Sequence, residues 1–450
     1  MSPAPPDPAA GDRVVEDHRQ YVFTSWSAQD SVHPLPIAGA EGSYVWDYSG
    51  KRYLDLSSQL VNANIGYGHP AVVAAIAQQA GRLCTVAPQH ANAERGTAAR
   101  MIAELAPGEG NRVFFTNAGT EAVEHAVRMA RVHTGRLKVL SAYRSYHGAT
   151  SLSIHLTGDA RRWPSDHGNE AVAHFFGPFL YRSAFGSSDE AEESARALQH
   201  LEAVIEMEGP STIAALILET VPGNPGILPP PPGYLAGVRE LCDRHGIVYI
   251  ADEVMCGFGR IGEWIAADHW GVAPDLITFA KGVNSGYVPL GGVVLSEPIA
   301  ATFAERPYPG GLTYSGHPLA CAAAVAAMTA MQDEGIVAHA ADIGKRVLGP
   351  GLLELAARHP SVGEARGLGV FWALELVRDR RTKEPLAPYG GSSEAMGAFA
   401  AACLEGGVLP LTVHNRLHVV PPCTISDQEV AEAVEILDRA LEVADRYVTG

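Results

Sequence analysis

Two residues that can do chemistry follow two short apolar segments near the middle of the chain. Asp252 directly follows the run at 247–251, and Lys281 directly follows the run at 276–280. Short apolar runs of this kind are typical of buried strands, and the intervening connection favours a parallel pair in a βαβ-like unit. Because parallel strands end at the same edge of a sheet, we expect Asp252 and Lys281 to share one crevice.

A carboxylate and an amine in one crevice are the groups that pyridoxal 5′-phosphate (PLP) chemistry requires. The amine of Lys281 can form a Schiff base with the aldehyde, and Asp252 can keep the pyridine nitrogen protonated, so that the ring withdraws electrons. Gly257 and Gly282 beside these residues let a ligand approach closely. Two residues alone leave an alternative open, in which Asp252 caps a helix and Lys281 is a solvated lysine at a strand end.

The motifs around this pair identify a family. Ala-Asp-Glu-Val at 251–254 is followed by Gly-Phe-Gly-Arg at 257–260 and by Pro-Asp-Leu-Ile-Thr-Phe-Ala-Lys-Gly at 274–282. This order resembles the signature of the class III aminotransferases, PLP enzymes of fold type I, and the similarity extends from about Trp46 to the C-terminus. The resemblance implies an α/β fold, in which a large domain with a mainly parallel sheet is joined to a small α+β domain.

The same resemblance and the local composition divide the chain into four parts. Residues 1–20 begin with a Pro/Ala-rich stretch and are predicted to be a disordered tail. Residues 21–60 are predicted to form an arm and a hairpin that join the small domain. Residues 61–330 then make the large PLP-binding domain, and residues 335–450 make the small domain.

A phosphate site is predicted where the strand at 111–116 leads into a helix. Gly119 and Thr120 lie at the helix start, and the free N–H groups and positive dipole end of a helix N-terminus bind anions. Thr120 as a plain N-cap is the alternative. The resemblance makes these two residues the donors of the cofactor's phosphate cup.

The resemblance assigns further residues to the cofactor. Tyr146, in the order Tyr-His-Gly, is expected to lie on the face of the pyridine ring, with His147 supporting it. Glu219, at the end of another apolar run, matches a glutamate that faces the cofactor in the family. Val254 is placed at the cofactor, and Thr313 at the phosphate of the neighbouring subunit's cofactor. A homodimer or a higher homo-oligomer is therefore expected, with the dimer as the minimal active unit.

Residues of the N-terminal part are expected to reach the substrate. Trp26 belongs to the aromatic-rich arm at 21–26, which borders the substrate pocket in the family. Gln59 and Leu60 lie in the polar stretch at 57–64, whose amide and hydroxyl groups suit a pocket wall better than a core. We expect all three residues to face substrate.

The chain departs from the ornithine- and 4-aminobutyrate-type members at an ion pair. Where many of them have Glu and Arg, this sequence has Asn224 and His418, a coherent change because a lone buried charge is costly. Arg416 is then predicted to grip the carboxylate or sulfonate of a substrate through its planar fork, ahead of Arg366, which matches an arginine near the domain interface. A surface arginine is the alternative for Arg416. A metal pair of His414 and His418 is disfavoured, because a strand would hold them too far apart to chelate.

Composition limits the remaining possibilities. The chain has 450 residues, of which 47% are hydrophobic and 18% are charged, as in ordinary globular proteins. Its net charge of −17 disfavours nucleic acid and anionic membranes as partners. The six cysteines form no C-x-x-C pair, and no apolar stretch reaches the ~18 residues of a membrane span. We therefore expect a soluble cytoplasmic protein without a metal site.

The expected function is transfer of an amino group from an ω-amino acid or amine to pyruvate or 2-oxoglutarate. The donor would be a β- or γ-amino acid or a taurine-like compound. A PLP-dependent decarboxylase, aminomutase or epimerase of the same fold remains an alternative, because such enzymes share Lys281 and Asp252. A non-catalytic PLP-binding regulator is disfavoured, because only a short tail precedes Tyr21 and the chain is acidic.

Overall fold

A mainly parallel sheet forms the centre of the larger part of the molecule. The computed structural model describes residues 6–165 and 171–449. Only β10 runs antiparallel to its neighbours in this sheet. The strand order is β4 (Arg112–Thr116), β10 (Gly291–Leu295), β9 (Leu276–Phe279), β8 (Val248–Asp252), β7 (Ile213–Glu219), β5 (Lys138–Ala142) and β6 (Val172–Phe175). All seven residues of β7 are buried, as near-continuous apolar strands are when both faces of a parallel sheet are covered.

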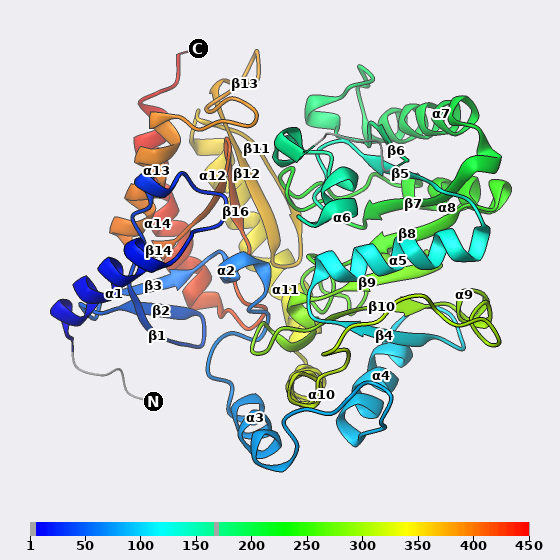
Figure 1. Ribbon diagram of the computed structural model, residues 1–450. Helices are drawn as coiled ribbons and strands as arrows, with labels where there is room; N and C mark the ends of the chain where they lie inside the picture. Colours follow the sequence, from blue (N-terminus) through cyan, green and yellow to red (C-terminus); the bar gives the residue numbers. More distant parts are fainter. Residues whose placement is uncertain (1–5, 166–170, 450) are drawn as a thin grey trace.

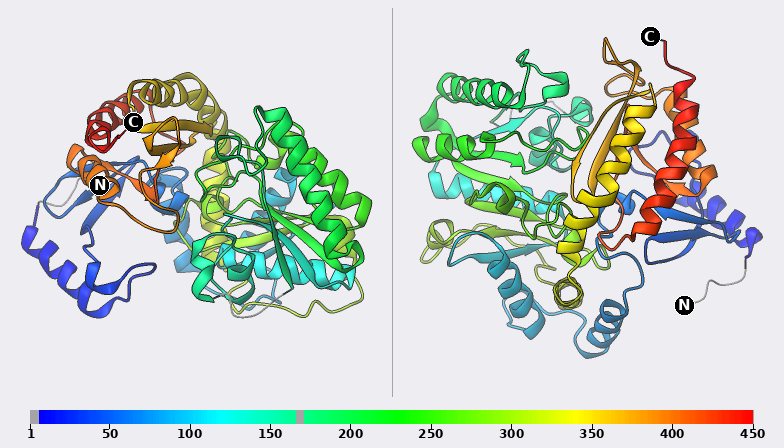
Figure 2. Two further views of the ribbon diagram at one scale, coloured as in Figure 1. Left: turned by 90° about the horizontal axis from the view of Figure 1, so that it is seen from above. Right: turned by 180° about the vertical axis from the view of Figure 1, so that it is seen from behind.

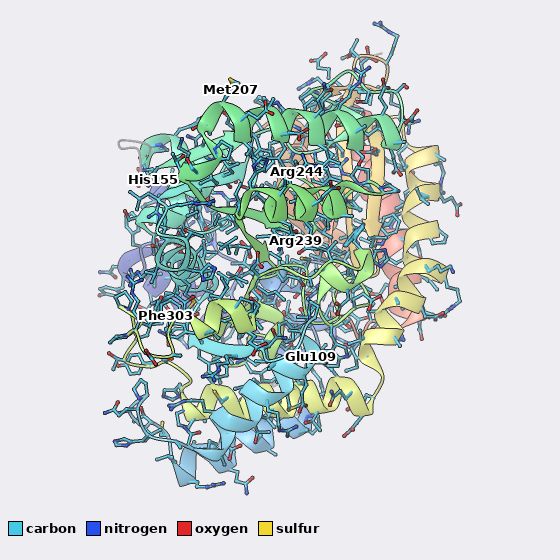
Figure 3. All side chains as sticks on the ribbon, turned by 90° about the vertical axis from the view of Figure 1, so that its right-hand side faces the viewer. Glu109, His155, Met207, Arg239, Arg244 and Phe303 are labelled. Atoms are coloured by element: carbon cyan, nitrogen blue, oxygen red, sulfur yellow. The ribbon has the colours of Figure 1, made fainter. Side chains whose placement is uncertain are left out.

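Helices cover both faces of this sheet (Figures 1 and 2). On one face, α5 (Gly119–Thr134) packs Val123 and Val127 onto the inner strands. On the other face lie α7 (Glu190–Glu208) and α8 (Tyr234–His245), which run side by side in Figure 3, with Met207 near the end of α7 and Arg239 and Arg244 on α8. Below the sheet in Figure 1, α10 (Pro318–Asp333) packs against α3 (Pro70–Arg82) and α4 (Ala93–Leu105).

A smaller part is built from both ends of the chain. Its strands lie in the order β11 (Val362–Leu368), β12 (Phe371–Asp379), β16 (Arg416–Val419) and β15 (Leu411–Val413), and β13 (Glu384–Pro385) pairs with β12. The covering helices are α11 (Ile336–Ile343), α12 (Gly349–Arg358), α13 (Glu394–Gly406) and α14 (Asp427–Asp445). The N-terminal sheet of β1 (Ile37–Glu41), β2 (Tyr44–Asp47) and β3 (Arg52–Asp55) joins this part through β14 (Val408–Leu409), which pairs in parallel with β3.

The structure corrects the predicted N-terminal tail. Residues 8–20 belong to the helix α1 (Pro8–Tyr21) rather than to a disordered segment, and residues 1–5 lie outside the described residues. Pro8 is pre-organised for the first helical position, and the side chain of Asp7 accepts a hydrogen bond from the backbone N–H of Ala10. The start of the helix is also held to the hairpin, because the Asp7 N–H donates to the carbonyl of Tyr48 at 2.8 Å.

The two strands that carry Asp252 and Lys281 pair as predicted. β8 and β9 are parallel, with Asp252 opposite Thr278. Their connection consists of turns and the short 3₁₀ helix Ala266–Trp270 instead of an α-helix. Within the described residues, the structure contains no helix with the length and apolar character needed to span a membrane.

Candidate active site

Three polar side chains lie in a row across the C-terminal edge of the large sheet. Glu219 on β7 is opposite Asp252 on β8, and Asp252 is opposite Thr278 on β9. Lys281 begins the 3₁₀ helix Lys281–Asn284, two residues after the end of β9. The buried apolar strands therefore position all four residues near the same edge of the sheet. The crevice predicted for Asp252 and Lys281 is therefore a real feature of the fold.

Asp252 is buried, and three hydrogen bonds hold its carboxylate. Its Oδ2 pairs with Nδ1 of His147 at 2.7 Å, and its Oδ1 accepts from the Val254 N–H and the Thr278 hydroxyl, both at 3.1 Å. Because both oxygens accept hydrogen bonds, the group is held in one orientation, and one of its acceptor positions is left for a further donor. His147 donates from Nδ1, and its Nε2 is buried without a hydrogen-bond partner among the described residues.

Lys281 occupies a strained position at the edge of this crevice. Its φ of 45° lies in the left-handed region, which non-glycine residues adopt mainly at functional sites or turns. Burial lowers the pKa of its amine, while the neighbouring Asp252 and Glu219 oppose the shift. A lysine with a lowered pKa has a larger neutral fraction near pH 7, which is the form that attacks carbonyl carbon and accepts protons.

Glu219 shapes the chain around the crevice. Its Oε1 accepts from the Tyr146 N–H at 2.9 Å, and its Oε2 accepts from the Gly223 N–H at 2.8 Å. Burial raises the pKa of Glu219, and the adjacent Asp252 adds to this effect, whereas His147 opposes it. The carboxyl group thus ties together the turns that carry Tyr146 and Gly223.

The start of α5 forms a tight anion cradle. Gly119 is its first residue, and a Cβ there would lie 2.8 Å from Cγ1 of Val254. The hydroxyl of Thr120 bonds to those of Ser153 at 2.7 Å and Thr150 at 2.9 Å. Thr120 is inside the helix, so it is not the N-cap, and the first-turn N–H groups lack intrahelical acceptors. The cradle matches the predicted phosphate cup in position.

Asp252, Lys281, Glu219 and the start of α5 border one pocket of about 840 Å³. Most of the predicted site residues border it: Trp26, Leu60, Gly119, Thr120, Tyr146, His147, Glu219, Asp252, Val254 and Lys281. Asn224 and His418 border it as well. Burial lowers the pKa of His418 to about 4, so this wall is uncharged, and its Nε2 bonds to the carbonyl of Gly223 at 2.9 Å.

An arginine that the sequence did not single out lies inside this pocket. The guanidinium carbon of Arg161 lies 3.7 Å from the centre of the Tyr146 ring, and its side chain pairs with Asp159. Asp159 in turn accepts from the Asn224 amide at 2.6 Å. The residues around Arg161 carry no clear helix or strand pattern, so no sequence signal distinguished Arg161 from a solvated arginine. Tertiary structure alone brings it over Tyr146.

Comparison with known proteins agrees with this geometry. Residues 26–441 match the aminotransferase class-III family. The chain belongs to the class-III aminotransferases. Putrescine–pyruvate aminotransferase of Pseudomonas aeruginosa is 33% identical, with 95% of this chain and 94% of the relative covered, and taurine–pyruvate aminotransferase of Bilophila wadsworthia is 32% identical, with 95% and 96% covered. The fold is also similar to that of taurine:2-oxoglutarate aminotransferase from Bifidobacterium kashiwanohense, solved with PLP and glutamate, at a TM-score of 0.94 and 40% identity, covering 98% of this chain and 99% of that one.

The predicted family and fold are thus confirmed, and this class-III aminotransferase uses PLP as its cofactor. The pocket fits that group on structural grounds. The cradle at Gly119 and Thr120 suits a phosphate, and the amine of Lys281 faces the same pocket as the carboxylate of Asp252. The orphan Nε2 of His147 leaves a buried donor or acceptor for a ligand to satisfy.

Four predicted site residues lie outside the pocket lining. Gln59 turns its amide to the Tyr67 hydroxyl at 2.8 Å, and Thr313 is exposed on a loop. Arg366 donates to the carbonyl of Gly226 at 2.8 Å, and Arg416 donates to that of Pro225 at 2.9 Å.

Arg416 lies outside the pocket lining, and its predicted grip on a substrate anion stays a prediction. Arg416 stands opposite Glu375 in the β12–β16 pair, and only 6% of it is exposed. Its guanidinium donates to the Pro225 carbonyl of the large part, and so links the two parts of the molecule. Among the described residues, no group of three or more His, Cys, Asp or Glu side chains could hold a metal ion.

Proposed function

We propose that this aminotransferase takes its amino group from an ω-amino acid or a taurine-like amine, with pyruvate or 2-oxoglutarate as acceptor. The observation that carries the proposal is the guanidinium of Arg161 in the same pocket as Lys281. An ω-amino donor with an acidic end needs a cation at one end of its site and an amine-exchanging lysine at the other. Similar enzymes are named for putrescine, taurine, pyruvate and 2-oxoglutarate, which supports the same classes of donor and acceptor.

The acidic end of the donor belongs at Arg161. Arg161 and Lys281 line the same pocket, and the positive charge of Arg161 adds to burial, the largest cause, in lowering the pKa of the Lys281 amine. Its side chain is 33% exposed, so it can turn one edge of its fork to a ligand while Asp159 holds the other. Trp26, which is 65% exposed, and Leu60, which is 53% exposed, supply an apolar wall for the methylene groups.

The other residues would hold and serve the cofactor. Gly119 and Thr120 bind the phosphate, Tyr146 packs against the ring, and Asp252, oriented by His147, pairs with the ring nitrogen. PLP, when bound, supplies the electron sink that makes a C–H bond next to the amino nitrogen acidic. Lys281 takes that proton as general base, a role that its lowered pKa favours.

We further propose that the enzyme is a cytoplasmic homodimer. Several large apolar side chains of the arm are exposed in the single chain, with Tyr21 at 74% and Phe23 at 84%. A second copy of the chain would cover such side chains, and the exposed loop with Thr313 could then reach the partner's phosphate cup. Mass photometry of the holoenzyme would test the dimer.

A donor panel tests the function itself. Taurine, β-alanine, 4-aminobutyrate and putrescine would each be mixed with pyruvate or 2-oxoglutarate, and the new amino acid would be quantified against the aldehyde formed. Equal amounts of the two products, largest for a donor with an acidic end, are expected. Release of CO₂ or inversion of a stereocentre without consumption of keto acid would refute the transaminase assignment in favour of another PLP reaction.

A further inference from the structure

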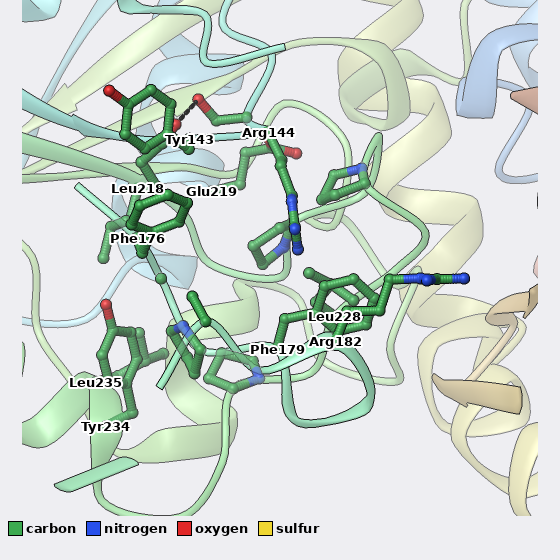
Figure 4. Close-up of a pocket in the computed structure, with 18 residues that line it drawn as sticks. Tyr143, Arg144, Phe176, Phe179, Arg182, Leu218, Glu219, Leu228, Tyr234 and Leu235 are labelled. Carbon is green, nitrogen blue, oxygen red and sulfur yellow. Dashed lines mark hydrogen bonds between the residues drawn. The ribbon is translucent and has the colours of Figure 1, made fainter. Parts of the chain in front are cut away.

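A second cavity lies behind Glu219, next to the active-site pocket. Its volume is about 50 Å³, and among the described residues Glu219 alone borders both spaces. Figure 4 shows that apolar side chains such as Leu228 and Phe179 form most of its wall. Two arginines also line it: Arg144, from the turn after β5, and Arg182, from the 3₁₀ helix Leu180–Arg182.

Neither arginine is fully paired. Arg144 makes no side-chain hydrogen bond or ion pair within the described chain, and its guanidinium carbon lies 5.1 Å from the centre of the Phe179 ring. The Nε of Arg182 donates a hydrogen bond to Glu375, but its Nη2 is buried without a partner in the described ranges. A buried guanidinium N–H without an acceptor is costly, so this cavity presents unused donors.

Two more arginines stand behind this pair, on the small sheet. The guanidinium carbon of Arg366 lies 4.9 Å from the centre of the Phe179 ring. Arg416 is buried, and its Nε has no partner in the described parts of the chain. Arg144 and Arg366 both help to lower the pKa of Arg416 to about 10, although burial is the largest cause. The four guanidinium groups therefore act on one another.

The nearby carboxylates do not balance this charge. Glu375 bridges Arg182 and Arg366, and Glu364 pairs with Arg366. Four guanidinium groups thus face two carboxylates. Glu219 also borders the cavity, and its two oxygens accept from the backbone N–H groups of Tyr146 and Gly223. Even when Glu219 is counted as a third carboxylate, the guanidinium groups remain in excess.

We propose that the cavity beside Phe179 is a binding site for a small monovalent anion of the halide class, held between Arg144 and Arg182. The small volume admits a single ion rather than a substrate. The buried, unpartnered Nη2 of Arg182 and the guanidinium of Arg144, which makes no side-chain hydrogen bond within the described chain, would supply its ligands. Because Arg182 is bonded through Glu375 to Arg366 on the small sheet, the bound ion stabilises the contact between the two parts of the molecule.

Crystallography of the holoenzyme with bromide tests the location. Crystals grown or soaked in sodium bromide are expected to show an anomalous peak between the guanidinium groups of Arg144 and Arg182. Absence of a peak there, with bromide visible elsewhere on the protein, would overturn the site.

Thermal unfolding of the holoenzyme tests the effect in solution. At fixed ionic strength, Tm is expected to be about 2 °C higher in sodium chloride than in sodium gluconate, whose anion is too large for the cavity. Arg144→Gln should abolish this difference without lowering Tm in gluconate, because it removes an unpaired charge. The control Arg100→Gln changes an exposed arginine of α4 and should keep the difference. An equal chloride effect in all three proteins would refute the proposal, and since the readout is Tm, it is separate from the donor assay.

Discussion

Replacing Arg161 by glutamine tests the proposed grip on the acidic end of the donor. Glutamine retains polarity and part of the length but removes the charge and the fork. The Asp159 carboxylate would keep its hydrogen bonds from the Asn224 amide and from the backbone N–H of residue 161, at 2.9 Å. The pocket is therefore expected to stay folded, so that a change in rate reports on substrate.

The structure sets the size of the effect. A hydrogen bond to a charged group contributes about 1.5–3 kcal/mol, and the one-third exposure of Arg161 places its contribution near the lower half of that range. About 2 kcal/mol corresponds to a loss of roughly 30-fold in kcat/KM. The loss should apply to taurine and β-alanine and be absent for n-butylamine, which has no acidic end.

Two variants sharpen the assay. Arg161→Lys keeps a charge without the planar fork and is expected to fall between the parent and Arg161→Gln. Arg416→Gln serves as the matched arginine outside the pocket and should leave the ratio of taurine to n-butylamine rates unchanged. If Arg416→Gln lowers that ratio and Arg161→Gln does not, the sequence-based choice of Arg416 is right and the pocket-based choice of Arg161 is wrong.

Three further outcomes are expected. Lys281→Ala should lose the visible absorbance of lysine-bound PLP, and borohydride treatment followed by peptide mass spectrometry should find no cofactor mass on the protein; a labelled peptide would refute the role of Lys281. Asp252→Asn should fold and bind PLP but lose at least about 100-fold in kcat, whereas near-parent turnover would contradict the proposed ring-nitrogen pairing. Burial lowers the pKa of His418 from 6.5 to about 4. As pH falls, this imidazole is therefore protonated in the unfolded chain at a higher pH than in the folded protein. The free energy of unfolding should therefore decrease from pH 6.5 to 4, by up to about 3 kcal/mol from this residue, and urea titrations of His418→Gln should show a shallower decrease; an unchanged slope would count against it.

The positions of the residues that we assign to the cofactor were predictable, because short-range patterns determine where they lie. Asp252 and Glu219 each end an apolar strand, and Gly119 begins a helix after another, so strand assignment alone brings them to one edge of the sheet. The family resemblance then supplied their expected roles. The helix α1 was missed because a Pro/Ala-rich composition is shared by disordered tails and by helix starts, and only the contact of Asp7 with Tyr48 distinguishes them.

The arginines were not predictable in the same way. Arg416 is near His418 in sequence, but its strand position opposite Glu375 directs its guanidinium to Pro225 rather than into the pocket. That register depends on β12, which is far away in the chain. Arg161 has no strand or helix signal at all, and its position follows from the packing of its segment over Tyr146.

The loop at 223–226 connects the active-site pocket to the small sheet. Its carbonyl groups accept hydrogen bonds from three side chains of that sheet: Gly223 from His418, Pro225 from Arg416, and Gly226 from Arg366. Gly226 has a φ of 110°, and a Cβ there would collide with both arginines, so glycine is required for this approach. Asn224 in the same loop donates to Asp159, and Asp159 pairs with Arg161, so a series of contacts joins the small sheet to the cation that we assign to the donor. The position of the cation that we propose for the donor therefore rests on the contact between the two parts as well as on the residues that line the pocket.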